Sequence, residues 1–88
     1  MGGVTTQLAA LRAEYRLTQA ELATLAGVSR QTINSIETGR FEPSLSLALR
    51  LARLFDRPVN AMFALDETEA ERAAALTLAP PAPRFAAP

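Results

Sequence analysis

Five side chains that can form directional hydrogen bonds lie close together in the sequence: Arg30, Gln31, Asn34, Ser35 and Thr38. On a helix turning about 100° per residue, the last four point the same way and Arg30 lies at their flank. The DNA major groove admits one helix, and there a guanidinium can pair bidentately with guanine and a carboxamide with adenine. These residue types could therefore recognise bases, provided that a helix holds them in place.

A first short helix is predicted to begin at Thr18. Thr18 and Glu21 have the spacing of a capping box, in which the hydroxyl and the carboxylate each accept a hydrogen bond from the other residue's backbone N–H. Gly27 is predicted to end this helix, because a helix C-terminus commonly needs a left-handed residue. The predicted buried side consists of Leu22, Ala23, Leu25 and Ala26.

A second helix follows almost at once. Ser29 is a good N-cap, and the helix is predicted to reach about Thr38, with Gly39 as its stop. Ile33 and Ile36 would anchor it to the core. Two short helices joined by a tight glycine turn form a helix-turn-helix. The polar side chains would then face outward.

The flanking segments predict more helices. Leu8, Leu11 and Tyr15 have helical spacing, which indicates a helix over about residues 5–15. Further helices are predicted over residues 44–55, 59–63 and 66–78. Their predicted core residues up to position 63 are Leu45, Leu47, Ala48, Leu51, Ala52, Leu54, Phe55, Val59, Met62 and Phe63.

The expected architecture is all-α, since no strand pattern is visible. Residues 4–65 are expected to form a compact five-helix bundle. Residues 66–88 would add a possible short sixth helix, acidic and rich in alanine, and a tail rich in proline and alanine.

Composition excludes most kinds of active site. The 88 residues include no cysteine and no histidine, so the usual metal ligands and the commonest general base are missing. Glu67, Glu69 and Glu71 form a solvated acidic run, not a paired acid–base site. We expect no enzyme activity, no catalytic residue, no metal and no cofactor. The sequence has no signal-peptide pattern and no membrane-length apolar run. The absence of cysteine fits the cytoplasmic protein that we expect.

The net charge is zero, but the charges are unevenly placed. Residues 1–60 carry seven arginines against five acidic residues, and residues 61–88 carry two against four. The front of the chain is mildly basic, which is a weak indication of a nucleic-acid partner.

The segment LRAEYRLTQAELATLAGVSRQTINSIETGRFEPSLSLALRLARLF resembles the Cro/CI-type (XRE) helix-turn-helix family, which has a lambda-repressor-like domain. The likeness covers about residues 8–63. Its helix-turn-helix spacing is that of Gln19, Ala23, Gly27, Ile33 and Ile36. The resemblance implies a sequence-specific regulator of transcription that binds double-stranded DNA, as a repressor, with residues 29–38 as the recognition helix.

The resemblance also implies roles for individual residues. Base contacts are implied at Arg30, Gln31 and Ser35, and helix geometry adds Asn34. Phosphate contacts are expected from Gln19 and Arg40, and from the helix N-termini at Thr18 and Ser29. Arg12 and Glu37 resemble a partly buried ion pair of the family, so we expect a structural role for both.

Two positions depart from the family pattern. Ala9 stands where a basic residue is frequent, and Arg16 stands where glycine is frequent. Arg16 would either add a phosphate contact or strain the end of the first helix.

Members of this family usually bind near-palindromic sites as dimers, so the resemblance implies a homodimer on an inverted-repeat operator. Residues 60–65 and the alanine-rich helix are the two candidate dimer surfaces. The alternative function is that of an antitoxin or interaction module, which would use the same fold to bind a partner protein. A module that binds only protein should have an apolar outer face on the second helix, and the face here is polar.

Overall fold

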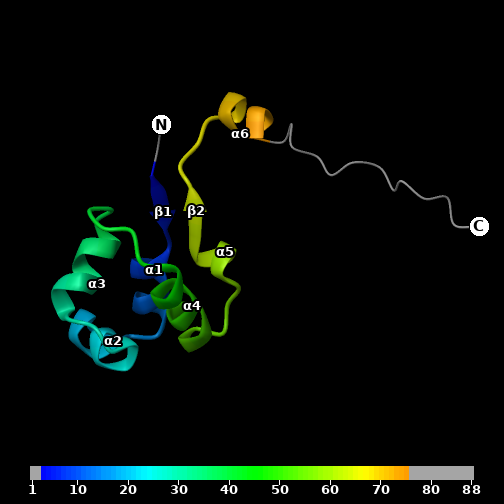
Figure 1. Ribbon diagram of the computed structural model, residues 1–88. Coiled ribbons are helices and arrows are strands. Elements are labelled where there is room, and N and C mark those ends of the chain that lie inside the picture. The colour runs from blue at the N-terminus through cyan, green and yellow to red at the C-terminus, as the bar shows by residue number, and fades with distance from the viewer. Residues whose placement is uncertain (1–2, 76–88) are drawn as a thin grey trace, which may run out of the picture.

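The structure, a computed structural model, describes residues 3–75 and contains six helices and two strands in that range (Figure 1). In chain order these are β1 (Val4–Thr6), α1 (Leu8–Glu14), α2 (Gln19–Ala26), α3 (Arg30–Glu37), α4 (Leu45–Leu54), α5 (Val59–Met62), β2 (Phe63–Leu65) and α6 (Glu69–Ala75).

The predicted helices are confirmed, with shifts at some ends. The first begins at Leu8 and not near residue 5, and the fifth stops at Met62. The sixth is capped by Thr68, whose hydroxyl accepts a hydrogen bond from the Glu71 N–H at 3.1 Å. The predicted end of this helix near residue 78 and the proline-rich tail lie outside the described residues.

The expectation that the chain has no strand was wrong. β1 and β2 pair antiparallel, with Val4 opposite Leu65 and Thr6 opposite Phe63, and Figure 1 shows them side by side. Phe63 was therefore wrongly assigned to a helix. Each strand has only three residues, too few to show a period-two pattern. The pairing also depends on residues about sixty positions away.

The core lies between α1, α2, α3 and α4. Its fully buried large side chains are Leu8, Leu22, Ile33, Ile36, Leu51 and Met62. Leu25, Leu45 and Leu54 were predicted to be buried but are exposed, at 55%, 73% and 39%. Each lies about a quarter turn from the buried stripe of its short helix, and such a helix buries only one stripe. None of the helices within residues 3–75 combines the length and apolar character needed to cross a membrane.

Four helices end in a residue of left-handed conformation. It is Gly27 after α2 and Gly39 after α3, with φ of 74° and 77° respectively. It is Arg16 after α1 and Asp56 after α4, with φ of 55° and 52° respectively. At each end the next residue's N–H donates back to the helix, as Leu17 does to the Arg12 carbonyl at 3.1 Å. The strain considered for Arg16 is thus present in the backbone.

Candidate nucleic-acid interface

Three local features fix α2 and α3 relative to each other. The Thr18 hydroxyl accepts from the Glu21 N–H at 3.0 Å, and the Glu21 carboxylate accepts from the Thr18 N–H at 2.8 Å. These hydrogen bonds hold the pKa of Glu21 below its ordinary value. Gly27 makes the turn in the left-handed conformation. The Ser29 hydroxyl then accepts from the Thr32 N–H at 3.1 Å and caps α3.

α3 is attached to the core by its inner face. Ile33 is completely buried and Ile36 is 2% exposed. Ala23 of α2 is 3% exposed, so the two helices are in close contact. The opposite face of α3 points away from the core, as the sequence predicted.

A partly buried ion pair ties α1 to the end of α3. Arg12 Nε donates to Glu37 Oε2 at 2.7 Å, and Arg12 Nη2 donates to Glu37 Oε1 at 3.2 Å. The Glu37 side chain is only 6% exposed. Burial raises the pKa of this carboxyl, but hydrogen bonds from Arg12 and Gln19 and the charge of Arg12 outweigh it, so the pKa lies below its ordinary value.

Gln19 joins this pair to the outer face of α3. Its Nε2 donates to Glu37 Oε1 at 2.9 Å and to Asn34 Oδ1 at 3.2 Å. Its Oε1 accepts from Arg30 Nη1 at 3.3 Å. The structure therefore brings one expected phosphate contact together with two expected base contacts. Asn34 is half-buried and its Oδ1 is occupied, whereas Arg30 is exposed.

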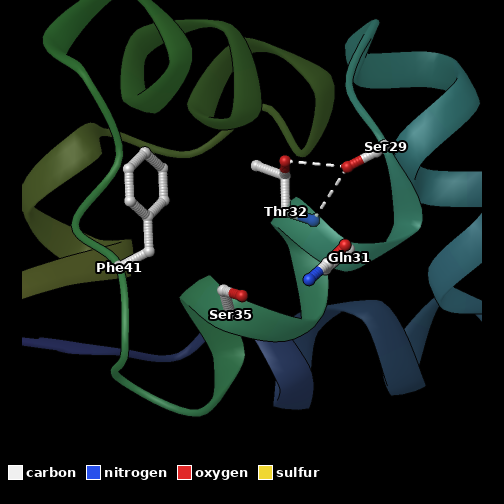
Figure 2. A pocket seen from close by; sticks show the side chains of 5 residues that line it. All are labelled: Ser29, Gln31, Thr32, Ser35 and Phe41. Carbon is white, nitrogen blue, oxygen red and sulfur yellow. Dashed lines mark hydrogen bonds between the residues drawn. The ribbon is translucent and has the colours of Figure 1, made fainter.

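The other expected base contacts lie beside this network. Gln31 is exposed and Ser35 half-buried, and within residues 3–75 neither side chain makes a hydrogen bond. Both line an open hollow of about 260 Å³ together with Ser29, Thr32 and Phe41 (Figure 2). Thr38 is less available, because its hydroxyl donates to the Asn34 carbonyl at 2.9 Å.

The expected phosphate contacts border the same face. Arg40 follows α3 directly, is exposed, and makes no ion pair in the described part of the chain. The hydroxyls of Thr18 and Ser29 serve as caps. A phosphate at these helix starts would therefore be bound by the unpaired backbone N–H groups of the first turn.

Sequence reasoning missed Phe41. This aromatic side chain is 48% exposed and lines the same hollow as Ser35 (Figure 2). The available signal was an aromatic residue two positions after Gly39, the stop of α3. Among residues 3–75 no group of His, Cys, Asp and Glu side chains could hold a metal ion.

Comparisons with known proteins agree with this geometry. The helix-turn-helix family HTH_3 matches residues 8–61. An uncharacterized HTH-type transcriptional regulator of Archaeoglobus fulgidus is 42% identical over 64 residues, which are 73% of this chain and 90% of the relative. An uncharacterized HTH-type transcriptional regulator of Methanothermobacter thermautotrophicus is 51% identical over 61 residues, which are 68% of this chain and 88% of that relative.

Solved structures are similar as well. The restriction-modification controller protein C.AhdI from Aeromonas hydrophila has a TM-score of 0.57 and 33% identity, covering 61% of this chain and 78% of that one. A transcriptional regulator from Listeria innocua has a TM-score of 0.63 at 22% identity, and the match covers 82% of this chain and 71% of that one. It shows the same fold. The chain thus belongs to the helix-turn-helix family of Cro/CI (XRE) type, a non-enzymatic family of DNA-binding transcriptional regulators.

Proposed function

We propose that this regulator recognises a specific double-stranded operator, with α3 in the major groove, and represses transcription by blocking access to a promoter. One observation carries the proposal. The outer face of α3 is polar and its Arg30 and Asn34 are hydrogen-bonded to Gln19, while Ile33 and Ile36 bury its inner face. A helix held in this way presents donors and acceptors at defined positions, which reading base edges requires.

The proposed contacts divide into two groups. Base contacts come from Arg30, which suits guanine, from Gln31 and Asn34, which suit adenine, and from Ser35. Phosphate contacts come from Gln19, Arg40 and the starts of α2 and α3. We assign residues 4–65 to the DNA-binding domain and residues 66–88 to an acidic, alanine-rich helix and a proline-rich tail.

A homodimer is part of the proposal, because one helix reads only a few base pairs. Two copies would place their α3 helices about 34–36 Å apart on an inverted repeat. Of the two candidate surfaces, residues 60–65 have the clearer support. Leu65 at the end of β2 is 68% exposed, while α6 offers mainly alanine. Figure 1 shows β2 and α6 on the side away from α2 and α3.

The partner-protein alternative has less support. A module that binds only protein requires apolar side chains on the outer face of α3, and the described residues there are arginine, glutamine, asparagine, serine and threonine. The exposed leucines Leu45 and Leu49 belong to α4.

The test is selection of bound sequences from a random DNA pool at physiological salt. We expect an enriched inverted repeat, and its spacing would fix the arrangement of the dimer. Gln31→Ala should then weaken binding by about 1–3 kcal/mol and relax one position of the selected site. Arg40→Ala should weaken all sequences alike and reduce the salt dependence. Weak binding without enrichment would contradict the proposal and favour a protein partner.

A selected site also allows repression to be tested. We expect the protein to lower transcription in vitro from a promoter that overlaps this site, and not from one in which the site is scrambled. Increased transcription would show an activator.

A further inference from the structure

Phe41 is held against the recognition helix by its backbone. Gly39 reverses the chain after α3, and the N–H groups of Arg40 and Phe41 both donate to the Ser35 carbonyl, at 2.9 and 3.2 Å. Because this carbonyl belongs to α3, Phe41 keeps a fixed position relative to the outer face of that helix.

The two-stranded sheet supports the same residue from behind. Phe41 lines a second, narrow hollow together with Val4, Thr6, Ile36, Glu42, Pro43 and Phe63, of which Val4, Thr6 and Phe63 belong to the sheet. Phe41 thus shares this hollow with apolar residues of the core and sheet, yet its side chain remains 48% exposed. An aromatic side chain placed in this way forms a stable apolar wall beside the polar face.

The hollow in front of Phe41 combines apolar and hydrogen-bonding walls. The hydroxyls of Ser29 and Thr32 lie 2.9 Å apart and bond to each other. The methyl group of Thr32 is therefore turned towards the Phe41 ring (Figure 2). Gln31 and Ser35 supply potential donors at the edge of the same hollow, which measures about 260 Å³.

Among the four bases, only thymine presents a matching edge in the major groove. Its C5 methyl group lies beside the O4 acceptor, whereas cytosine presents an N4 donor and no methyl group, and both purines present N7 without a methyl group. A methyl group would fit between the Phe41 ring and the Thr32 methyl, while O4 accepts from Gln31 or Ser35.

We infer that Phe41 and Thr32 form a subsite for a thymine methyl group, so that Phe41 is a specificity-determining residue. This inference rests on the proposed function, because it requires α3 to enter the major groove. The subsite recognises the methyl group itself and not the general shape of the backbone.

The test replaces each thymine of the selected operator by deoxyuridine, which removes only the methyl group. With the unmodified protein, we expect one thymine in each half-site at which this change weakens binding about three- to tenfold. With Phe41→Ala, the same replacement at that position should have no effect. Phe41→Leu, which keeps an apolar side chain, should retain part of the discrimination.

Leu45→Ala is the matched control. It removes an apolar side chain that is 73% exposed and does not line the hollow, so the thymine-to-uracil ratio should stay unchanged. Thermal unfolding of each variant would verify that it folds.

Two results would overturn the inference while leaving the proposed function intact. One is a selected operator at which no uracil replacement matters. The other is Phe41→Ala binding all sequences more weakly with the uracil effect unchanged, which would indicate contact with a sugar. If selection yields no operator at all, the proposed function fails and the subsite fails with it.

Discussion

Two regions of this molecule end their helices with the same turn but with different residues. In the helix-turn-helix region, residues 18–39, the left-handed residues are Gly27 and Gly39. In what we name the α1–α4 corner, residues 14–16 and 55–57, they are Arg16 and Asp56. A residue with a Cβ is strained in this conformation by about 1–2 kcal/mol, whereas glycine is not. Backbone strain at these turns is therefore confined to the corner.

The ion pairs of the two regions also differ, in distance and in exposure. Arg12 and Glu37 are 2.7 Å apart, with side chains that are 22% and 6% exposed. At the corner, Arg57 and Glu14 are 3.6 Å apart, with side chains that are 45% and 61% exposed. The close, partly buried pair adjoins Gln19 and the outer face of α3, while the exposed pair lies at the corner, away from Gln19 and that face.

The difference indicates where geometry matters. In the helix-turn-helix region, turn residues and hydrogen bonds all favour one orientation of α3. The corner is held instead by packing: the Tyr15 and Phe55 rings meet edge to face, with their centroids 5.2 Å apart. Such a contact tolerates small backbone shifts, so backbone strain at Arg16 and Asp56 leaves the outer face of α3 in place.

The largest expected effect is that of breaking the partly buried pair of Arg12 and Glu37. Glu37→Ala should lower the free energy of unfolding by about 3 kcal/mol, because it leaves the Arg12 guanidinium poorly solvated and removes an acceptor from Gln19. Urea unfolding would measure this. The matched change in the corner, Glu14→Ala, should cost less than about 1 kcal/mol. Equal losses would contradict the contrast between the two pairs.

A smaller effect is expected at the glycine turn. An added Cβ at Gly27 would meet only Arg50 Nη1 at 3.6 Å, an ordinary contact. Gly27→Ala should therefore cost about 1–2 kcal/mol from backbone strain alone. Gly39→Ala, where nothing lies within 4 Å of the added atom, should cost about the same. Neutral substitutions at both positions, seen in urea unfolding, would remove the basis of the comparison.

The corner should respond in the opposite direction. Arg16→Gly should raise the free energy of unfolding by up to about 1 kcal/mol, since the relieved strain exceeds the conformational entropy that glycine adds to the unfolded chain. Arg16→Ala is the control, because alanine keeps the Cβ and should give no such gain. A melting curve in which alanine stabilises as much as glycine would point to the arginine side chain as the cause.

The helices and their caps could be predicted because their signals are local. Thr18, Ser29, Gly27 and Gly39 each act on neighbours a few residues away. The family resemblance added the role of Arg12 and Glu37, whose pairing spans 25 residues.

Features that depend on distant residues were missed. The strands pair residues at opposite ends of the domain. Leu25 was wrongly predicted to be buried, because the helices packed against α2 decide which stripe of α2 is buried. Phe41 escaped notice because its place in the site depends on hydrogen bonds to Ser35 and on support from the sheet.

The smallest expected effect is a dependence of stability on pH that belongs to the helix-turn-helix region. The folded state holds the pKa of Glu37 below 4.5, its ordinary value. A carboxyl with a lowered pKa contributes stability above its unfolded pKa and loses it as the pH falls through the folded pKa. The difference in unfolding free energy between the unmodified protein and Glu37→Gln should therefore shrink below about pH 4.5.

Glu21, bonded to Thr18, contributes in the same direction, so the Glu37 comparison should be repeated in a Glu21→Gln background. There the difference should still shrink as the pH falls. Growth of the difference would mean that burial of Glu37 outweighs its hydrogen bonds. Because these two causes oppose each other, the sign of this small effect tests whether Arg12 and Gln19 favour the charged carboxylate, which is the property that separates this pair from the exposed pair at the corner.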